Sequence, residues 1–325
     1  MQSRTDYLLS VAPMMDWTDR HCRYFLRQLS PAPRLYTEMV TAAALLHGDA
    51  DRLLHFDSSE HPVALQLGGA DPQMMAEAAA MGAAAGYDEI NINVGCPSDR
   101  VQNGQFGACL MAEPERVARC VTAMRDVCEM PVTVKTRIGI DDNDSYDYLR
   151  NFVETVAAAG CTTFIVHARI AILAGLSPKE NRTVPPLNYE RVYRLKEEHP
   201  DLTIVLNGGI TTVEQAEQHL QHVDGVMIGR QAYHDPWFIV ELTRALTGSD
   251  ALLKRHDAVA RMRPYIEAQL GDGAMLKHIS RHMLGLFAGQ PGARAWRRYL
   301  SEHAHLEGSD FAVLERALAA MPQAA

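Results

Sequence analysis

Eight short apolar runs alternate with helical segments over the first 230 residues, and this alternation limits the fold more than any other feature. Each run is about as long as a β-strand, and most are rich in valine and isoleucine, as strands buried on both faces are. The runs are residues 8–14, 34–39, 63–69, 89–95, 132–139, 163–168, 203–209 and 225–230. Such alternation predicts an α/β fold, a (β/α)8 TIM barrel.

The rival arrangement is a doubly wound parallel sheet, which usually has fewer strands and a glycine-rich first turn. Neither GxGxxG nor GxxxxGKS/T occurs in the sequence. The helical segments begin with typical signals, since Asp71 followed by Pro72 matches an N-cap and a proline at the first helical position. The barrel is therefore the favoured fold.

The C-terminal part of the chain has a different pattern. Residues 246–258 have the composition of a linker, and beyond them apolar residues recur only at helical spacing. A length of 325 residues is enough for about two domains. We expect a barrel domain at 1–245 and a small all-helical domain at 255–325.

Charge is distributed unevenly along the chain. The net charge is −9, yet residues 254–298 contain nine lysine or arginine residues against three acidic ones, so this segment is +6 and the rest is −15. Three arginines share one helical face, with one aromatic residue between them and one directly after them: Arg294, Arg297, Arg298, Trp296 and Tyr299. A solvated basic face and a nucleic-acid contact both explain this pattern.

Several classes of protein are excluded. No run approaches the ~20 continuous apolar residues of a membrane span, and the apolar stretch near the N-terminus is too short for a signal peptide. We expect a cytoplasmic protein with no membrane contact. Six cysteines occur without a CxxC pair, and His278 and His282 lack a third ligand, so no metal site is expected.

Polar residues end all eight runs, where barrel enzymes place their active sites. They are Met14–Asp16 (with two methionines before the acid), Glu38, Gln66, Asn93 to Cys96, Lys135 with Arg137, His167 with Arg169, Asn207 to Gly209, and Gly229 with Arg230. Packing does not require polar groups at every strand end. The pattern predicts a catalytic or ligand-binding site at this end of the barrel.

Two of these groups suggest particular roles. Gly208, Gly209 and Gly229 let backbone N–H groups approach a phosphate, although ordinary turns use glycine as well. Cys96 ends a strand and precedes a long polar loop, which fits a reactive or proton-donating thiol, although most lone cysteines are simply buried. An inward-pointing Lys135 needs an anionic or electron-rich partner, or an ion pair with Glu38 or Asp16.

Longer motifs resemble one family. The segments VAPMMDWTDRHCRYFLR, YDEININVGCPSDRVQNGQFGACLM, PVTVKTRIGIDD, GLSPKENRTVPPL and PGARAWRRYLSEHAH are similar to the tRNA-dihydrouridine synthases, and most closely to their A subfamily. The resemblance covers nearly the whole chain. It departs from the family pattern at Ile170, where a polar or basic residue is expected.

The resemblance implies a flavoenzyme with an FMN-binding barrel and a helical tRNA-binding domain. It implies reduction of uridines 20 and 20a in the tRNA D-loop, with NADPH as reductant and no obligate protein partner. Cys96 is the acid. The implied FMN residues are Pro13, Met14, Met15, Gln66, Lys135, His167, Asn207, Gly208, Gly209, Gly229 and Arg230. The implied tRNA residues are Asn93, Lys179, Arg182, Arg294 and Arg297.

Two other functions remain open at this point. An FMN-dependent reductase or dehydrogenase of a free pyrimidine would use related chemistry, and the basic helical segment argues against it. A non-catalytic tRNA-binding barrel would keep the same scaffold, and the set of Cys96, Lys135 and His167 argues against that.

Overall fold

The structure is a computed structural model that describes residues 4–98, 104–249 and 253–321. Residues 99–103, which belong to the motif after Cys96, and residues 250–252 of the expected linker lie outside the described residues. Among the described residues, no helix is both long and apolar enough to cross a membrane.

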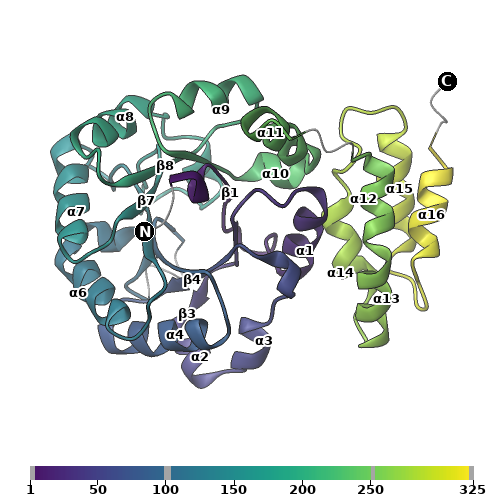
Figure 1. Ribbon diagram of the computed structural model, residues 1–325, viewed down its shortest axis with the longest axis horizontal. Helices are drawn as coiled ribbons and strands as arrows, with labels where there is room; N and C mark the ends of the chain where they lie inside the picture. Colours follow the sequence, from purple (N-terminus) through teal and green to yellow (C-terminus); the bar gives the residue numbers. More distant parts are fainter. Residues whose placement is uncertain (1–3, 99–103, 250–252, 322–325) are drawn as a thin grey trace. The chain divides into compact units, whose positions relative to one another are not determined.

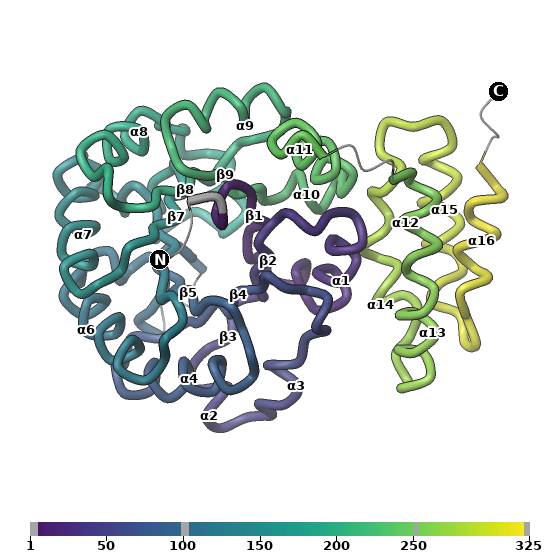
Figure 2. Tube along the Cα trace, viewed as in Figure 1, coloured from purple at the N-terminus to yellow at the C-terminus, as the bar shows by residue number. Residues whose placement is uncertain are grey.

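A parallel sheet in the order β1-β9-β8-β7-β6-β5-β4-β2 forms the barrel, with β3 also paired to β4. The strands are β1 Leu9–Val11, β2 Leu35–Tyr36, β3 Val40–Thr41, β4 Val63–Gly68, β5 Glu89–Val94, β6 Val132–Arg137, β7 Thr163–His167, β8 Thr203–Asn207 and β9 Gly225–Ile228. A bridge between Ser10 and Arg34 brings β1 back to the start of β2. Figure 2 follows the chain round this barrel, and the predicted (β/α)8 fold is confirmed.

The second predicted strand is shorter than its apolar run. Residues 34–39 form only the two-residue strand β2, and pairing with β4 resumes at β3. The interruption has a local cause, because the N–H of Gln66 donates to the Thr37 hydroxyl at 3.0 Å instead of to a backbone carbonyl.

Helices surround the strands of the barrel (Figure 1). They are α2 Ala42–His47, α3 Ala50–Leu54, α4 Pro72–Ala84, α6 Pro114–Arg125, α7 Tyr146–Ala158, α8 Tyr189–Glu198 and α9 Val213–Leu220, with 3-10 turns η1 Arg4–Tyr7, η2 Ser58–Glu60, η3 Gly107–Ala112 and η4 Glu180–Arg182. The predicted start of α4 is confirmed, since the Asp71 side chain accepts from the N–H of Met74 at 2.9 Å and Pro72 is the first helical residue.

The described chain divides into two compact units, and the second is discontinuous in sequence. The first comprises Met1–Met15 and Arg34–Gly229, and the second comprises Asp16–Pro33 and Arg230–Ala325. The second unit contains α1 Arg20–Leu29, α10 Arg230–His234, α11 Trp237–Thr247, α12 Arg255–Arg261, α13 Arg263–Gly271, α14 Leu276–Ser280, η5 Arg281–Met283, α15 Ala293–His303 and α16 Ala312–Ala319.

This division differs from the expected boundary near residue 250. Helix α1 packs against α11, α12 and α14, and the hydroxyls of Ser30 and Thr243 are hydrogen-bonded at 2.7 Å. Residues 16–33 and 230–245 therefore pack within the second unit. The functional assignment of 1–245 to FMN and of 255–325 to tRNA stays a prediction.

Candidate active site

The register of the strands brings the predicted site residues of the first unit together. Asn93 on β5 is aligned with Lys135 on β6, and His167 on β7 is aligned with Asn207 on β8. The barrel interior behind them includes an apolar cluster of Tyr7, Ala12, Tyr36, Ala64, Ile165, Val205 and Met227, against which Met14 packs. Met15 is 50% exposed.

Cys96 is held in place through Asn93. The Oδ1 atom of Asn93 accepts from the N–H groups of Gly95 and Cys96, at 3.1 and 3.0 Å. The backbone oxygen of Cys96 accepts from Ala108 at 2.9 Å, and its partly exposed thiol contacts the Ser98 hydroxyl at 3.4 Å. A thiol is therefore fixed at the end of β5 with access to a ligand.

Lys135 is partly buried and donates no hydrogen bond to a described residue, so the alternative ion pair with Glu38 is not formed. The pKa of Lys135 is lowered to about 7, mainly by burial and also by the nearby Arg137, whereas Cys96 acts in the opposite direction. An amine in this environment fits an electron-rich or anionic ligand, because such a ligand would stabilise its charged form.

Arg137 has a structural role that the sequence did not reveal. Its Nε donates to the carbonyl of Gly95 at 2.9 Å, and its Nη1 donates to the carbonyls of Ile170 and Asn181, at 2.8 and 3.0 Å. This buried guanidinium ties the backbone beside Cys96 to the segment 170–181. Ile170, the departure from the family pattern, serves here through its carbonyl.

The turn after β8 fits a phosphate. Gly208 and Gly209 have φ values of +117° and +77°, which favour glycine, and their N–H groups donate to no residue that the structure describes. Gly208 is buried, and a buried N–H without an acceptor is costly unless a ligand supplies one. Asn207, just before this turn, is held to the neighbouring strand, since its Nδ2 donates to the carbonyl of Met227 at 2.8 Å.

The remaining predicted residues are found in both units. Lys179 and Arg182 are exposed at η4 in the first unit. Gly229 ends the first unit, and Arg230 begins α10 in the second. The assignment of Gly229 and Arg230 to FMN and of Lys179 and Arg182 to tRNA stays a prediction.

Helix α15 carries the expected basic face. Arg294 and Arg297 are exposed and form no ion pair with a described residue. Trp296 takes no part in this face, because its side chain is fully buried and its Nε1 donates to the carbonyl of Met283 at 3.0 Å. Within the described ranges, no three His, Cys, Asp or Glu side chains gather as a metal site requires.

Sequence reasoning missed a set of buried polar residues beneath Gln66 and Asn93. Glu89, Asn91 and Thr133 are each no more than 1% exposed and face the barrel interior. A signal was present, because Glu89, Asn91 and Asn93 alternate along a strand whose residues are all buried. Alternate polar residues on a buried strand share one face and must find hydrogen-bond partners there.

Fold and site together define a (β/α)8-barrel protein whose predicted ligand-binding groups lie at the carboxyl ends of the strands. The family model described as "Dihydrouridine synthase (Dus)" matches residues 10–323, and the chain belongs to this family. It is therefore related to oxidoreductases that act on tRNA.

Several relatives are similar over nearly their full length, and each is named tRNA-dihydrouridine(20/20a) synthase. The one from Salmonella typhimurium is 61% identical over 314 residues, covering 96% of this chain and 94% of the relative. The one from Shewanella oneidensis is 59% identical over 313 residues (96% and 93%), and the one from Escherichia coli K12 is 61% identical over 311 residues (95% and 90%).

A solved complex of 2-naphthoyl-CoA reductase with 2-naphthoyl-CoA has a similar fold. Its TM-score is 0.54 at 8% identity, and the match covers 74% of this chain and 49% of that chain. At this identity the likeness concerns the barrel fold alone.

Proposed function

We propose that this chain reduces the C5=C6 bond of uridines 20 and 20a in the D-loop of tRNA to 5,6-dihydrouridine, in the cytoplasm. FMN, kept reduced by NADPH, supplies the hydride that is added to C6. Membership of the dihydrouridine synthase family supports the reaction, and the names of the similar relatives support the two positions.

The observation that carries the proposal is the anchoring of Cys96. Its N–H is bonded to Asn93, whose strand position is aligned with Lys135. The uracil C5=C6 bond is conjugated to the C4 carbonyl, so a hydride at C6 leaves an enolate whose C5 must receive a proton. The Cys96 thiol donates that proton, because a positioned acid can act within the site without waiting for water.

The groups that would hold FMN have distinct tasks. Gln66 and Lys135 hydrogen-bond the ring, while Pro13, Met14, Met15 and His167 pack beside it. The N–H groups of Gly208 and Gly209, with Asn207, Gly229 and Arg230, bind the phosphate. Lys135 also stabilises negative charge near the ring through its ammonium group.

The tRNA must present a uridine that its own fold keeps stacked, and splaying this base out costs a few kcal/mol. Phosphate contacts from Lys179, Arg182, Arg294 and Arg297 offset that cost, and Asn93 lies beside the base. These contacts should weaken with salt, since counterions compete for the phosphates.

The test is to measure dihydrouridine at each position of unmodified tRNA incubated with NADPH and the purified protein. Cys96→Ala should abolish product at 20 and 20a while reduction of the bound flavin by NADPH survives. Cys128→Ala is the matched control, because this part-buried thiol just after α6 contacts only nearby backbone, including the Met124 carbonyl at 3.2 Å.

The outcomes separate the alternatives. A yellow, NADPH-reducible protein that reduces a free pyrimidine and leaves tRNA unchanged would instead be a free-pyrimidine reductase. A colourless protein that binds tRNA without flavin would be a non-catalytic tRNA-binding barrel. Equal loss of both half-reactions in Cys96→Ala would remove the thiol from the role of acid.

A further inference from the structure

A chain of buried hydrogen bonds runs inside the barrel from the start of β5 to its end. The hydroxyl of Thr133 donates to Oε1 of Glu89 at 2.5 Å, and Asn91 Nδ2 donates to that hydroxyl at 2.8 Å. Gln66 Nε2 donates to Asn91 Oδ1 at 2.8 Å, and Asn93 Nδ2 donates to Gln66 Oε1 at 2.9 Å. All five side chains are no more than 9% exposed.

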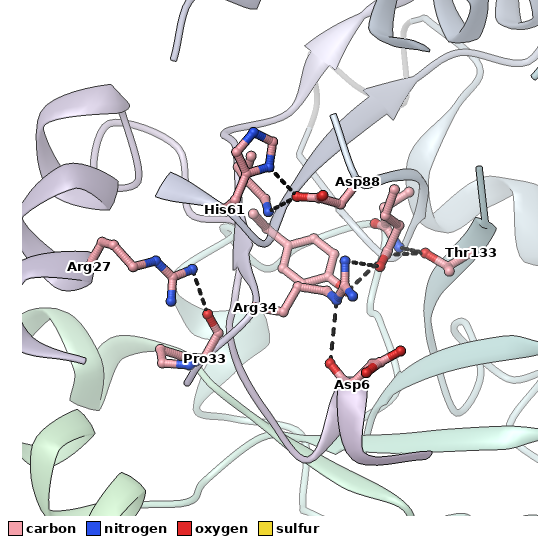
Figure 3. Close-up of polar contacts among 11 residues, drawn as sticks. Asp6, Arg27, Pro33, Arg34, His61, Asp88 and Thr133 are labelled. Atoms are coloured by element: carbon pink, nitrogen blue, oxygen red, sulfur yellow. Dashed lines mark hydrogen bonds and ion pairs between the residues drawn. The ribbon is translucent and has the colours of Figure 1, made fainter. Parts of the chain in front are cut away.

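The lower end of this chain is a carboxylate with several partners. Glu89 also accepts from the Tyr36 hydroxyl at 2.9 Å and forms an ion pair with Arg34 at 3.5 Å. Figure 3 shows Arg34 and Thr133 directed toward one another, with the backbone oxygen of Asp6 on Arg34. Burial raises the pKa of Glu89, whereas Arg34 and the hydroxyl donors oppose that rise.

The direction of every bond in the chain follows from its two ends. Glu89 Oε1 accepts from the Thr133 hydroxyl, so the single proton of that hydroxyl is committed to Glu89 and its oxygen must accept from Asn91. Asn91 then turns its oxygen to Gln66, and Gln66 turns its oxygen to Asn93. At the other end the N–H groups of Gly95 and Cys96 independently require the oxygen of Asn93.

The two ends therefore agree, and neither amide can rotate by 180° without losing bonds. A flipped Asn93 would place its NH2 group against two backbone N–H donors. A flipped Gln66 would place oxygen against oxygen at Asn91. Asn91, Gln66 and Asn93 are each paired at both the nitrogen and the oxygen of the amide, which specifies one arrangement, and removal of one member leaves its neighbours unpaired.

We infer that Glu89, Thr133 and Asn91 are positioning residues of the active site, which fix the amide orientation of Gln66 and Asn93 and, through Asn93, the backbone at Cys96. They act through their neighbours and take no part in the chemistry themselves. The inference deepens the proposed function and rests on it only for the effect on turnover.

The decisive variant is Thr133→Val, which removes the hydroxyl at nearly constant volume. Thr136→Val is the matched control, because Thr136 is equally buried on the same strand. Its hydroxyl makes only long hydrogen bonds, of 3.4 and 3.5 Å, to two backbone carbonyls that are not part of the hydrogen-bond network. Thr133→Ser keeps the hydroxyl and serves as the rescue variant.

Two readouts are measured on the full-length protein. Hydrogen exchange of the Gly95 and Cys96 amides should be at least tenfold faster in Thr133→Val, while exchange in β8 is unchanged. The kcat for tRNA should fall about tenfold with the tRNA KM within twofold of the unmodified chain. Thr133→Ser should restore both quantities to within twofold, and Thr136→Val should alter neither.

Other results would decide against the inference or separate it from the proposed function. If Thr133→Val exchanges its Gly95 and Cys96 amides no faster than Thr136→Val does, or exchanges faster evenly over all strands, the inference is overturned. Localised exchange in a protein that makes no dihydrouridine would support it while the proposed function fails. If Thr133→Val is insoluble, Asn91→Leu cuts the chain one link higher and must give the same localised effect.

Discussion

Single residues of this site show two ways in which the barrel prepares for a ligand. Lys135 keeps an amine partly buried without a hydrogen-bond partner among the described residues, and Gly208 and Gly209 keep backbone N–H groups without acceptors there. Each arrangement costs free energy in the ligand-free protein and returns it on binding. For Lys135, whose side chain can be removed without backbone strain, replacement by an apolar residue should therefore stabilise the empty barrel or leave its stability unchanged.

Lys135 makes stability depend on pH. Its pKa is about 7 in the folded protein and near its ordinary, higher value in the unfolded chain, so between pH 7 and 10 the unfolded chain binds more protons. The free energy of unfolding should therefore rise with pH across that window, by at most about 1.4 kcal/mol per unit. Urea unfolding of the ligand-free protein at several pH values measures this pH dependence, and Lys135→Met should remove it. If the free energy of unfolding rises equally with pH in both proteins, Lys135 is not its source.

Gly209 is the position where a side chain should harm ligand binding most directly. An added Cβ would lie 2.6 Å from both Leu187 Cδ1 and Tyr189 Oη, in a backbone conformation with φ of +77°. Gly209→Ala should lower the free energy of unfolding by about 1–3 kcal/mol and reduce the FMN retained per protein. Gly86→Ala is the control, because Gly86 has φ of +89° with nothing within 4 Å. Equal FMN retention in the two variants would exclude a phosphate role for this turn.

At the scale of elements, β2, β5 and β6 are joined by polar side chains as well as by the sheet. Arg34, at the start of β2, also bridges to β1 through its backbone, so the same residue closes the barrel and balances Glu89. Because the Glu89 carboxylate is fully buried, its charged form is tolerated in the folded protein only with Arg34 as its counter-ion.

Arg34→Met should therefore destabilise the protein strongly. We expect a loss of about 3–5 kcal/mol in the free energy of unfolding, because Glu89 stays buried without its counter-ion. Arg52→Met removes an exposed ion pair with Asp49 (71% and 62% exposed side chains) and should cost less than about 1 kcal/mol. Urea unfolding compares the two, and similar losses would show that Glu89 needs no cation.

Most elements could be predicted from periodicity, because strands and helices bury different spacings of apolar residues. All eight apolar runs form strands, and the start at Asp71 and Pro72 is where the pattern placed it. Strand ends also predicted which residues meet at the mouth. The hydrogen-bond network from Glu89 to Asn93 could not be predicted from the sequence, because Thr133 is far from Asn91 along the chain and only the strand register brings them together. The discontinuous second unit could not be predicted either, because it depends on tertiary packing.

At the scale of the whole molecule, the acidic net charge of −9 contrasts with the basic segment 254–298. Arg294 and Arg297 are exposed on α15, while Trp296 between them belongs to the interior of its unit. Recognition by this helix would therefore depend on charge rather than on stacking, which makes it a phosphate contact without sequence preference.

Replacing both Arg294 and Arg297 by alanine should raise the tRNA KM and leave NADPH oxidation with a small acceptor unchanged. The slope of log K against log salt for tRNA binding should become shallower by about 1–2, since each phosphate contact contributes roughly one. Arg316→Ala removes an exposed arginine from α16 and is the control. An unchanged salt slope in the double variant would place the tRNA elsewhere.

The discontinuous second unit has a consequence for how the chain is made. Helix α1 leaves the ribosome early, and its buried Phe25, Leu26 and Leu29 need to be covered, yet its partners α11, α12 and α14 are synthesised only after all the strands of the barrel. Until then this apolar face is open to chaperones or to other nascent chains. A chain cut after residue 245 would keep most of α11 but lack α12 and α14, so part of that face would stay exposed. Truncation at the apparent linker should therefore produce aggregates rather than a free-standing barrel.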